Sequence, residues 1–219
     1  MEWPLLSGLP PEEVRRVLTH ARRRRFAAKE ALFHEGDPGD SLYLVEKGRV
    51  AIRVTTAAGD TATLAVLGPG TSFGEQALFT ERHRRTATAT ALEPTETLSI
   101  GQAELAALRA RYPQIDRVLI GMLVGTVQRL TRHLVEALYL PVEKRVLRRL
   151  LALGEQYAEG EQTVVIPLTQ EDLGDLAGAS RATVNQVLRK FEESGAMALH
   201  RGRIEILDRR ALVRAAQGG

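Results

Sequence analysis

The most informative segment of this sequence is FGEQALFTERHRRTATA, residues 73–89. It opens with a glycine turn at Gly74 and the carboxylate of Glu75, and it runs into an alternating segment that begins with Arg85 and Thr86. A guanidinium binds phosphate oxygens as a planar fork, a hydroxyl adds a donor, and successive backbone N–H groups after a glycine form an anion-binding concavity. The carboxylate would repel a phosphate, but it would accept hydrogen bonds from ribose hydroxyls. The stretch therefore predicts a site for a small molecule with both a phosphate and a sugar diol, formed by Gly74, Glu75, Gln76, Ala77, Arg85 and Thr86.

Short strand-like segments surround this stretch from Phe26 to Ile100. Apolar side chains recur at every second position, the period of a half-buried strand, in residues 50–54, 62–66 and 86–91. In the second of these segments we expect Ala62, Leu64 and Val66 to face inward. Glycine-containing turns separate the segments, at 36–40, 47–48, 58–60 and 68–70. Many short strands with regular turns predict an antiparallel, jelly-roll-like β-roll, and the arginine run at 22–25 is expected to be a solvated edge leading into its first strand.

A helical period begins after Pro113. Apolar residues spaced alternately three and four apart form a seam, which consists of Ile120, Leu123, Val127, Leu130, Leu134 and Ala137. This is the coiled-coil period, and a helix of about 25 residues would span roughly 37 Å, longer than a small roll needs. The alternative is a helix packed on its own sheet, but we favour a homodimer seam. Proline disfavours helical geometry, so the helix is expected to end at Leu140-Pro141, with a hinge between domains there.

A helix-turn-helix is predicted between residues 169 and 193. Thr169 precedes an acid-rich first turn, a tight turn follows at 178–180, and Ser180 can cap a second helix over 181–193. One face of the second helix is apolar, with Val184, Val187, Leu188 and Phe191. The opposite face carries Arg181, Ala182, Asn185, Gln186 and Arg189. Arg, Asn and Gln pair with guanine and adenine edges in a major groove, so double-stranded DNA is the expected partner, with a plain helical hairpin as the alternative.

A wing is predicted directly after this second helix. Residues 195–206 read as two strands joined by a glycine turn, in which Arg201 and Arg203 would contact the phosphate backbone. Bulk charge adds little, because residues 141–219 contain 12 Lys and Arg against 11 Asp and Glu. A basic surface that binds DNA must therefore arise from the clustering of lysines and arginines on one face of the domain.

The order of these motifs, with a 73–89 cassette, a long helix and a winged helix-turn-helix, resembles the cyclic-AMP receptor (Crp/Fnr) family of bacterial transcription regulators. The resemblance covers nearly the whole chain and implies an α+β protein with three parts. These are a cyclic-nucleotide-binding β-roll (1–111), a dimerisation helix with a hinge (112–140) and a winged helix-turn-helix (141–219). It also implies a homodimeric regulator. Activation is favoured over repression, because the loop at 157–162 lies where relatives touch RNA polymerase.

The resemblance also assigns roles to individual residues. In the family, two adjacent hydroxyl residues of the long helix contact adenine, one from each subunit, and the matching positions are Leu130 and Thr131. Only Thr131 keeps the hydroxyl, so cyclic AMP is the leading effector, while cyclic GMP or no required ligand stays open. Losing one such hydrogen bond costs about 1 kcal/mol, which lowers selectivity for adenine more than binding itself.

On the DNA side, Arg181 matches a family arginine that reads guanine. The next family position is acidic and is Ala182 here, while a further DNA-contacting arginine corresponds to Gln186. The operator is therefore expected to keep a G at the Arg181 position and to differ elsewhere from the family half-site. The full candidate set on DNA is Thr169, Gln170, Ser180, Arg181, Ala182, Thr183, Asn185, Gln186, Arg189, Arg201 and Arg203.

Composition excludes several classes of site. The 219 residues contain no cysteine, which removes disulfides, thiolate metal sites and cysteine-ligated iron–sulfur clusters. The 5 histidines show no ligand-like spacing, so neither a metal nor haem is expected. No apolar run approaches the roughly 18 residues of a membrane span, and the N-terminus has no secretory signal, so no membrane partner and a cytoplasmic protein are expected.

Other functions remain as alternatives. One is a regulator of the same family that needs no ligand and has a vestigial pocket, and another is a regulator of a different small effector, a redox or gas sensor included. A stand-alone ligand module is disfavoured by the second half of the chain. An enzyme is the weakest option, because Glu75, Arg85 and Thr86 lack a second carboxylate or a poised base.

Overall fold

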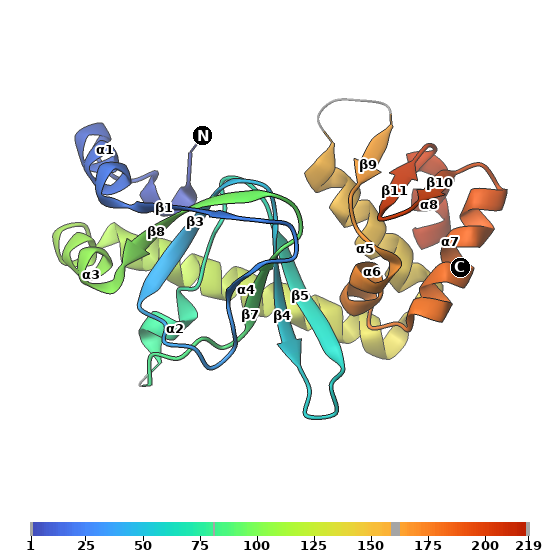
Figure 1. Ribbon diagram of the computed structural model, residues 1–219, viewed down its shortest axis with the longest axis horizontal. Coiled ribbons are helices and arrows are strands. Elements are labelled where there is room, and N and C mark those ends of the chain that lie inside the picture. Colours follow the sequence, from blue (N-terminus) through green and yellow to red (C-terminus); the bar gives the residue numbers. More distant parts are fainter. Residues whose placement is uncertain (1, 81, 159–162, 218–219) are drawn as a thin grey trace. The chain divides into compact units, whose positions relative to one another are not determined.

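The computed structural model describes residues 2–80, 82–158 and 163–217, and its contacts divide the chain into two compact units (Figure 1). The first unit comprises Met1–Val54 with Leu64–Arg129, and the second comprises Thr55–Thr63 with Leu130–Gly219. The long helix α4 (Gln114–Tyr139) is continuous across the division. It ends directly before Leu140-Pro141, where the sequence predicts its end.

The first unit is built on two four-stranded sheets. One sheet has the order β1-β8-β3-β6, from β1 (Arg22–Phe26), β8 (Thr95–Gly101), β3 (Ser41–Lys47) and β6 (Ser72–Phe73). The other has the order β2-β7-β4-β5, from β2 (Ala31–Phe33), β7 (Thr88–Ala91), β4 (Val50–Thr55) and β5 (Thr61–Leu67). The β8 strand pairs antiparallel with β1 and β3, and β7 pairs antiparallel with β2 and β4. The predicted antiparallel β-roll is thus confirmed.

The β3 strand is buried on both of its faces, which explains its unbroken apolar run. Leu42 and Leu44 pack into a cluster with residues of α1 (Pro11–His20), α3 (Gln102–Arg111) and the start of α4. Tyr43 and Val45 point the other way, into a cluster with residues of the second sheet. Because alternate residues of a strand face opposite sides, one strand supplies both cores. A short 3₁₀ helix, η1 (Pro4–Leu6), adds Leu5 and Leu6 to the helical side.

Two strand predictions need correction. In β5 the buried residues include Thr63 and Ala65, whereas Ala62 is exposed and Leu64 is half-buried, so the predicted inward set is wrong apart from Val66. The alternation of small apolar and polar residues in this strand was too weak to fix its facing. The arginine run is not a lead into the first strand either, because residues 22–25 form β1 itself, exposed along their whole length and paired with β8.

The second unit contains the helix-turn-helix. Its helices are α5 (Val142–Tyr157), α6 (Gln170–Ala177), α7 (Arg181–Glu193) and α8 (Arg209–Gln217). Its strands are β9 (Val164–Ile166), β10 (Met197–His200) and β11 (Arg203–Ile206). The wing sheet has the order β10-β11-β9, so the predicted two-stranded wing has a third strand at the edge of β11. The four apolar residues predicted for one face of α7 are all buried, which confirms that face.

Candidate functional site

Arg85 lies at the centre of the predicted ligand site and is almost entirely buried, with 4% of its surface exposed. Its Nη1 donates to the carbonyls of Ser41 at 2.8 Å and Gly74 at 3.0 Å, and its Nη2 donates to Ser41 Oγ at 3.2 Å. The guanidinium also stacks over the Phe33 ring, 4.2 Å from its centroid. The protein therefore holds this side chain in one orientation by contacts on three sides.

One edge of this guanidinium is unclaimed by the described residues. Arginine has five N–H donors, and the contacts above use both of those on Nη1 and one on Nη2. The buried Nε has no hydrogen-bond partner in the part of the chain that the structure describes. Nε and the second N–H of Nη2 point to the same side, which is the fork geometry that binds an oxyanion with two parallel hydrogen bonds. Burial lowers the pKa of Arg85, nearby Tyr43, Asp40, Asp37 and Glu75 raise it, and the group remains a cation.

Gly74 is required by the backbone on two grounds. Its φ of +87° lies in the left-handed region that side chains disfavour. A Cβ built at this position would also lie only 2.7 Å from Nη1 of Arg85. The glycine therefore lets the turn and the guanidinium approach each other, which the sequence pattern alone did not reveal.

Glu75 follows this turn and is 6% exposed. Burial raises the pKa of its carboxyl, and this outweighs the lowering by its backbone hydrogen bond and by the charges of Arg129 and Arg85. The Arg129 side chain comes from α4, with its Nη2 donating to Thr126 Oγ1 at 3.2 Å and its Nε buried without a partner among the described residues. Sequence reasoning missed Arg129, because only the fold brings α4 near the cassette.

Two further cassette residues, Gln76 and Ala77, begin the short helix α2 (Gln76–Phe79), and Thr86 lies before β7. Thr86 donates its hydroxyl to Gln76 Oε1 at 2.9 Å, so these two predicted residues are in contact, and Ala77 is buried in the same turn. The Leu78 amide donates to the Glu75 carbonyl, whereas the amides of Gln76 and Ala77 precede this bond and have no acceptor within the helix. The structure thus brings Gly74, Glu75, Gln76, Ala77, Arg85 and Thr86 together in one place.

Leu130 and Thr131 follow Arg129 on α4, and both are exposed. The apolar seam is also exposed, with Ile120 60%, Val127 63% and Leu134 59% accessible. At these three positions the described residues leave the side chains largely uncovered, whereas Leu123 is half-buried and Ile115 and Leu119 of the same helix pack into the core beside β3.

The helix-turn-helix is capped as the sequence predicts. Thr169 and Asp172 form a capping box, in which the Asp172 amide donates to Thr169 Oγ1 and the Thr169 amide donates to Asp172 Oδ2. Gly178 ends α6 in the left-handed conformation with φ +59°. Ser180 then caps α7 by accepting a hydrogen bond from the Thr183 amide at 3.2 Å. Each end of the turn is therefore specified locally.

The outward face of α7 and the wing carry the candidate DNA-contacting residues. Arg181, Ala182, Gln186 and Arg189 are exposed, Asn185 is half-buried, and Arg189 Nε donates to Asn185 Oδ1 at 3.2 Å. A groove of about 280 Å³ lies between the starts of α6 and α7 and the wing. Its lining includes Thr169, Gln170, Glu171, Arg181, Arg201 and Arg203. Three arginines and one carboxylate thus line a groove beside two helix N-termini, a net positive arrangement that suits phosphate contacts.

Three other expectations concern groups away from these sites. The loop predicted to touch RNA polymerase lies mostly outside the described residues, since 159–162 are not among them. Within the described ranges, no three His, Asp or Glu side chains come together in a way that could hold a metal ion. None of the helices described is both long enough and apolar enough to cross a membrane.

Comparison with known proteins agrees with this architecture. Residues 23–112 match the model of the cyclic nucleotide-binding domain, and residues 144–215 match that of the Crp-like helix-turn-helix domain. The cyclic AMP receptor protein of Thermus thermophilus is 34% identical over 98% of this chain and 97% of its own length. The CRP-like cAMP-activated global transcriptional regulator of Mycobacterium tuberculosis is 30% identical over 97% of this chain and 96% of its own.

Solved structures show the same fold. The Thermus thermophilus catabolite activator protein is 34% identical with a TM-score of 0.55, covering 98% of this chain and 99% of that one. A transcriptional regulator of the CRP/FNR family, also from Thermus thermophilus, is 25% identical with a TM-score of 0.75, covering 90% and 99%. The chain therefore belongs to the Crp/Fnr family of transcription regulators, and it joins a cyclic nucleotide-binding domain to a Crp-like DNA-binding domain.

Proposed function

We propose that this chain is a homodimeric transcription activator whose binding to DNA is controlled by cyclic AMP in the β-roll. The observation that carries the proposal is the Nε and Nη2 edge of Arg85, which is buried near the carboxylate of Glu75 and has an Nε without a partner among the described residues. A cyclic phosphodiester needs the first group and a ribose hydroxyl needs the second. Both stand in a chain that also carries a helix-turn-helix.

In this proposal each cassette residue has one role. Arg85 binds two phosphate oxygens with its Nε and Nη2 edge, and Thr86 adds a hydroxyl after turning from Gln76. The backbone from Gly74 to Ala77 donates to the phosphate and the ribose, and Glu75 accepts from the ribose hydroxyl. Because Arg85 is already oriented by Ser41 and Gly74, little ordering is required when the ligand binds.

The base is recognised less completely than the phosphate and ribose. Thr131 supplies one hydroxyl and Leu130 supplies none. We therefore expect the binding free energy to favour cyclic AMP over cyclic GMP by no more than one hydrogen bond contributes, about 1 kcal/mol. The names of the Thermus and Mycobacterium relatives support cyclic AMP. A regulator of similar fold from Xanthomonas campestris is described as responsive to c-di-GMP, which makes that nucleotide a necessary comparison.

A second copy of the chain is the proposed occupant of the α4 seam. Leu134 and Val127 lie in the seam at the coiled-coil period and are more than half exposed. Leu134→Glu should convert the dimer into a monomer in sedimentation equilibrium, because it places a charge in that seam. Val135→Glu, next to it and outside the heptad positions, is the matched control. A dimer that persists in Leu134→Glu would contradict this interface.

Two copies would place two recognition helices about 34 Å apart, one turn of DNA, so the operator should have two-fold symmetry. The residues proposed to contact it are Thr169, Gln170, Ser180, Arg181, Ala182, Thr183, Asn185, Gln186, Arg189, Arg201 and Arg203. Activation through RNA polymerase and the 157–162 loop rests on the family resemblance. The effector can change DNA affinity only by the difference in its own affinity for the two states of the dimer.

The test combines calorimetry with DNA binding. Cyclic AMP, cyclic GMP and c-di-GMP are titrated into the full-length protein, and binding to a selected operator is followed by fluorescence anisotropy with and without each nucleotide. We expect saturable binding of cyclic AMP and a higher operator affinity in its presence. Operator binding that no nucleotide changes would instead assign a ligand-independent regulator.

A further inference from the structure

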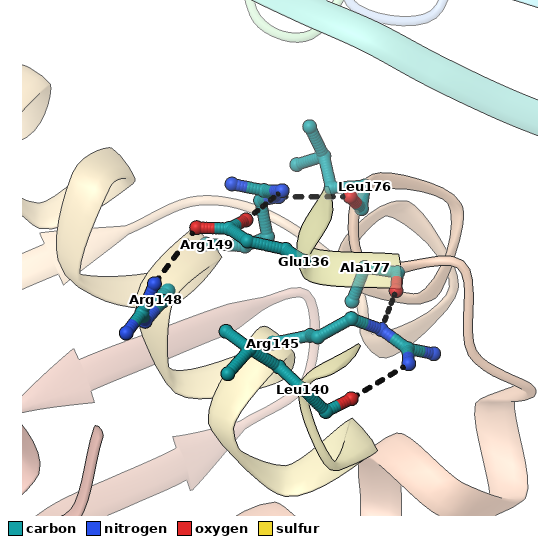
Figure 2. A network of polar contacts seen from close by, with 7 residues as sticks. All are labelled: Glu136, Leu140, Arg145, Arg148, Arg149, Leu176 and Ala177. Carbon is teal, nitrogen blue, oxygen red and sulfur yellow. Dashed lines mark hydrogen bonds and ion pairs between the residues drawn. The ribbon is translucent and has the colours of Figure 1, made fainter. Parts of the chain in front are cut away.

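Within the second unit, a buried carboxylate joins the last turn of α4 to α5 (Figure 2). Glu136 is 5% exposed, although it lies on a helix whose neighbouring side chains Leu134, Val135 and Leu138 are largely exposed. Its Oε1 accepts from Arg148 Nη1 at 3.1 Å, and its Oε2 accepts from Arg149 Nη2 at 2.5 Å. Glu136 is therefore the buried side chain of this turn, and its two ion pairs reach α5.

The two partners of this attachment come from α5, and one of them continues to the helix-turn-helix. While Nη2 of Arg149 binds Glu136, its Nε donates to the carbonyl of Leu176 at 3.2 Å. Leu176 lies in the last turn of α6, whose carbonyls accept no hydrogen bond within the helix and attract cations. Arg149 therefore connects α4 with the end of α6 through one planar group, as Figure 2 shows.

Arg145 makes a second connection of the same kind. Its Nη1 donates to the carbonyl of Leu140 at 3.2 Å, its Nε donates to the carbonyl of Ala177 at 3.1 Å and its Nη2 donates to that of Gly178 at 3.1 Å. Gly178 begins the turn that leads to α7. The two arginines therefore bind the C-terminal carbonyls of α6 at the turn that sets the direction of the recognition helix α7. Two arginines thus join residues on both sides of Pro141 to the turn of the helix-turn-helix.

Burial raises the pKa of Glu136, but the hydrogen bonds and charges of Arg148 and Arg149 together lower it by more. The pKa therefore lies below its ordinary value. The carboxylate is therefore ionised at neutral pH, and both contacts are charge-assisted. A rotation about Pro141 would have to separate these groups.

We propose that Glu136 is a positioning residue for DNA binding, which joins the last turn of α4, the start of α5 and the turn of the helix-turn-helix into one body. The effector response would then pass through this body, and the ion pairs of Glu136 would oppose bending at Pro141, where the sequence predicts the hinge. Only the consequence for effector response rests on the proposed function. The mechanical connection itself does not.

The first test is hydrogen exchange on the full-length protein. In Glu136→Gln, amide exchange should rise on the order of tenfold both at residues 136–140 and at residues 177–181, because the charge-assisted bonds that join them are lost. Arg149→Lys keeps the charge but has no planar fork to reach Glu136 and Leu176 together, so it should act in the same direction. Glu155→Gln, which removes an exposed ion pair with Arg209, is the control and should leave both segments unchanged.

Faster exchange confined to residues 136–140, or no change in either segment, would overturn the proposal. The second test compares operator affinity with and without cyclic AMP. Glu136→Gln should bind cyclic AMP with an affinity within about twofold of the wild type. The factor by which cyclic AMP raises operator affinity should, however, be about tenfold smaller in the variant than in the wild type. An undiminished increase would also overturn it. If the wild type binds no cyclic nucleotide, the proposed effector fails, while the exchange result still decides the role of Glu136.

Discussion

Arg85 and Arg181 are both assigned to nucleotide groups, but their surroundings differ in every respect. Arg85 is buried in the β-roll and held by three hydrogen bonds and an aromatic ring. Arg181 is exposed at the first turn of α7, beside an open groove. A small ligand supplies few contacts, so its site must be built before it arrives. DNA supplies a long surface of phosphates and base edges, so exposed side chains can order on binding.

The largest effect is expected from Arg85→Lys. Lysine keeps the charge but lacks the fork, and it leaves the carbonyls of Ser41 and Gly74 without their donor, so cyclic AMP affinity should fall on the order of 100-fold and thermal stability should fall as well. Calorimetry and thermal melting measure the two effects. Arg84→Lys is the control, since Arg84 makes an exposed contact with the Gly36 carbonyl. Equal affinity in Arg85→Lys and wild type would mean that the buried cation is structural only.

Arg181→Ala should have the next largest effect. A bidentate contact to guanine contributes about 1–3 kcal/mol, so operator affinity should fall roughly 10- to 100-fold and the preference for G at one half-site position should disappear. Fluorescence anisotropy with operators changed at single positions measures both. Arg209→Ala, on α8, is the control. Binding-site selection with the wild type should also depart from the family consensus opposite Ala182 and Gln186, and recovery of the unchanged consensus would contradict the assignments on α7.

The raised pKa of Glu75 predicts a smaller effect of pH. Ribose hydroxyls donate to the ionised carboxylate, so cyclic AMP affinity should fall several-fold as the pH is lowered from about 7.5 to about 5. For folding the sign is opposite. The native state binds the proton more tightly than the unfolded chain, so the ligand-free protein gains stability as the pH falls through the raised pKa. Calorimetry across this range should show a flatter profile for Glu75→Gln, and parallel profiles for variant and wild type would contradict the role of the carboxylate.

Arg201→Ala should have the smallest effect. A phosphate contact carries no sequence information, so operator and non-specific affinities should weaken by the same modest factor. The slope of log K against log salt should become shallower by about one unit. Titrations at several salt concentrations on two unrelated DNA sequences measure this. A loss confined to one sequence would show that Arg201 reads bases.

Local signals predicted the ends of the two helices of the helix-turn-helix to the residue. The capping residues Thr169 and Ser180 and the turn glycine Gly178 specify where α6 and α7 begin and end, because capping is decided within a few residues. In the β-roll the predicted strands exist, but the facing of β5 was wrong at Ala62 and Leu64, because strand facing depends on which partner strands cover it.

The order of β-roll, long helix and winged helix-turn-helix could be read from the residues alone, together with the cassette from Gly74 to Thr86, because turns, caps and periodicity are local properties of the chain. Three features emerged only from the folded chain: Arg129 acts on Glu75, the buried Arg85 Nε has no partner among the described residues, and Glu136 and Arg149 join α4 to the end of α6. Each of these depends on side chains far apart in sequence meeting in a partly dry environment. There the strength of a charge or hydrogen bond is set by burial, which no short stretch of sequence encodes.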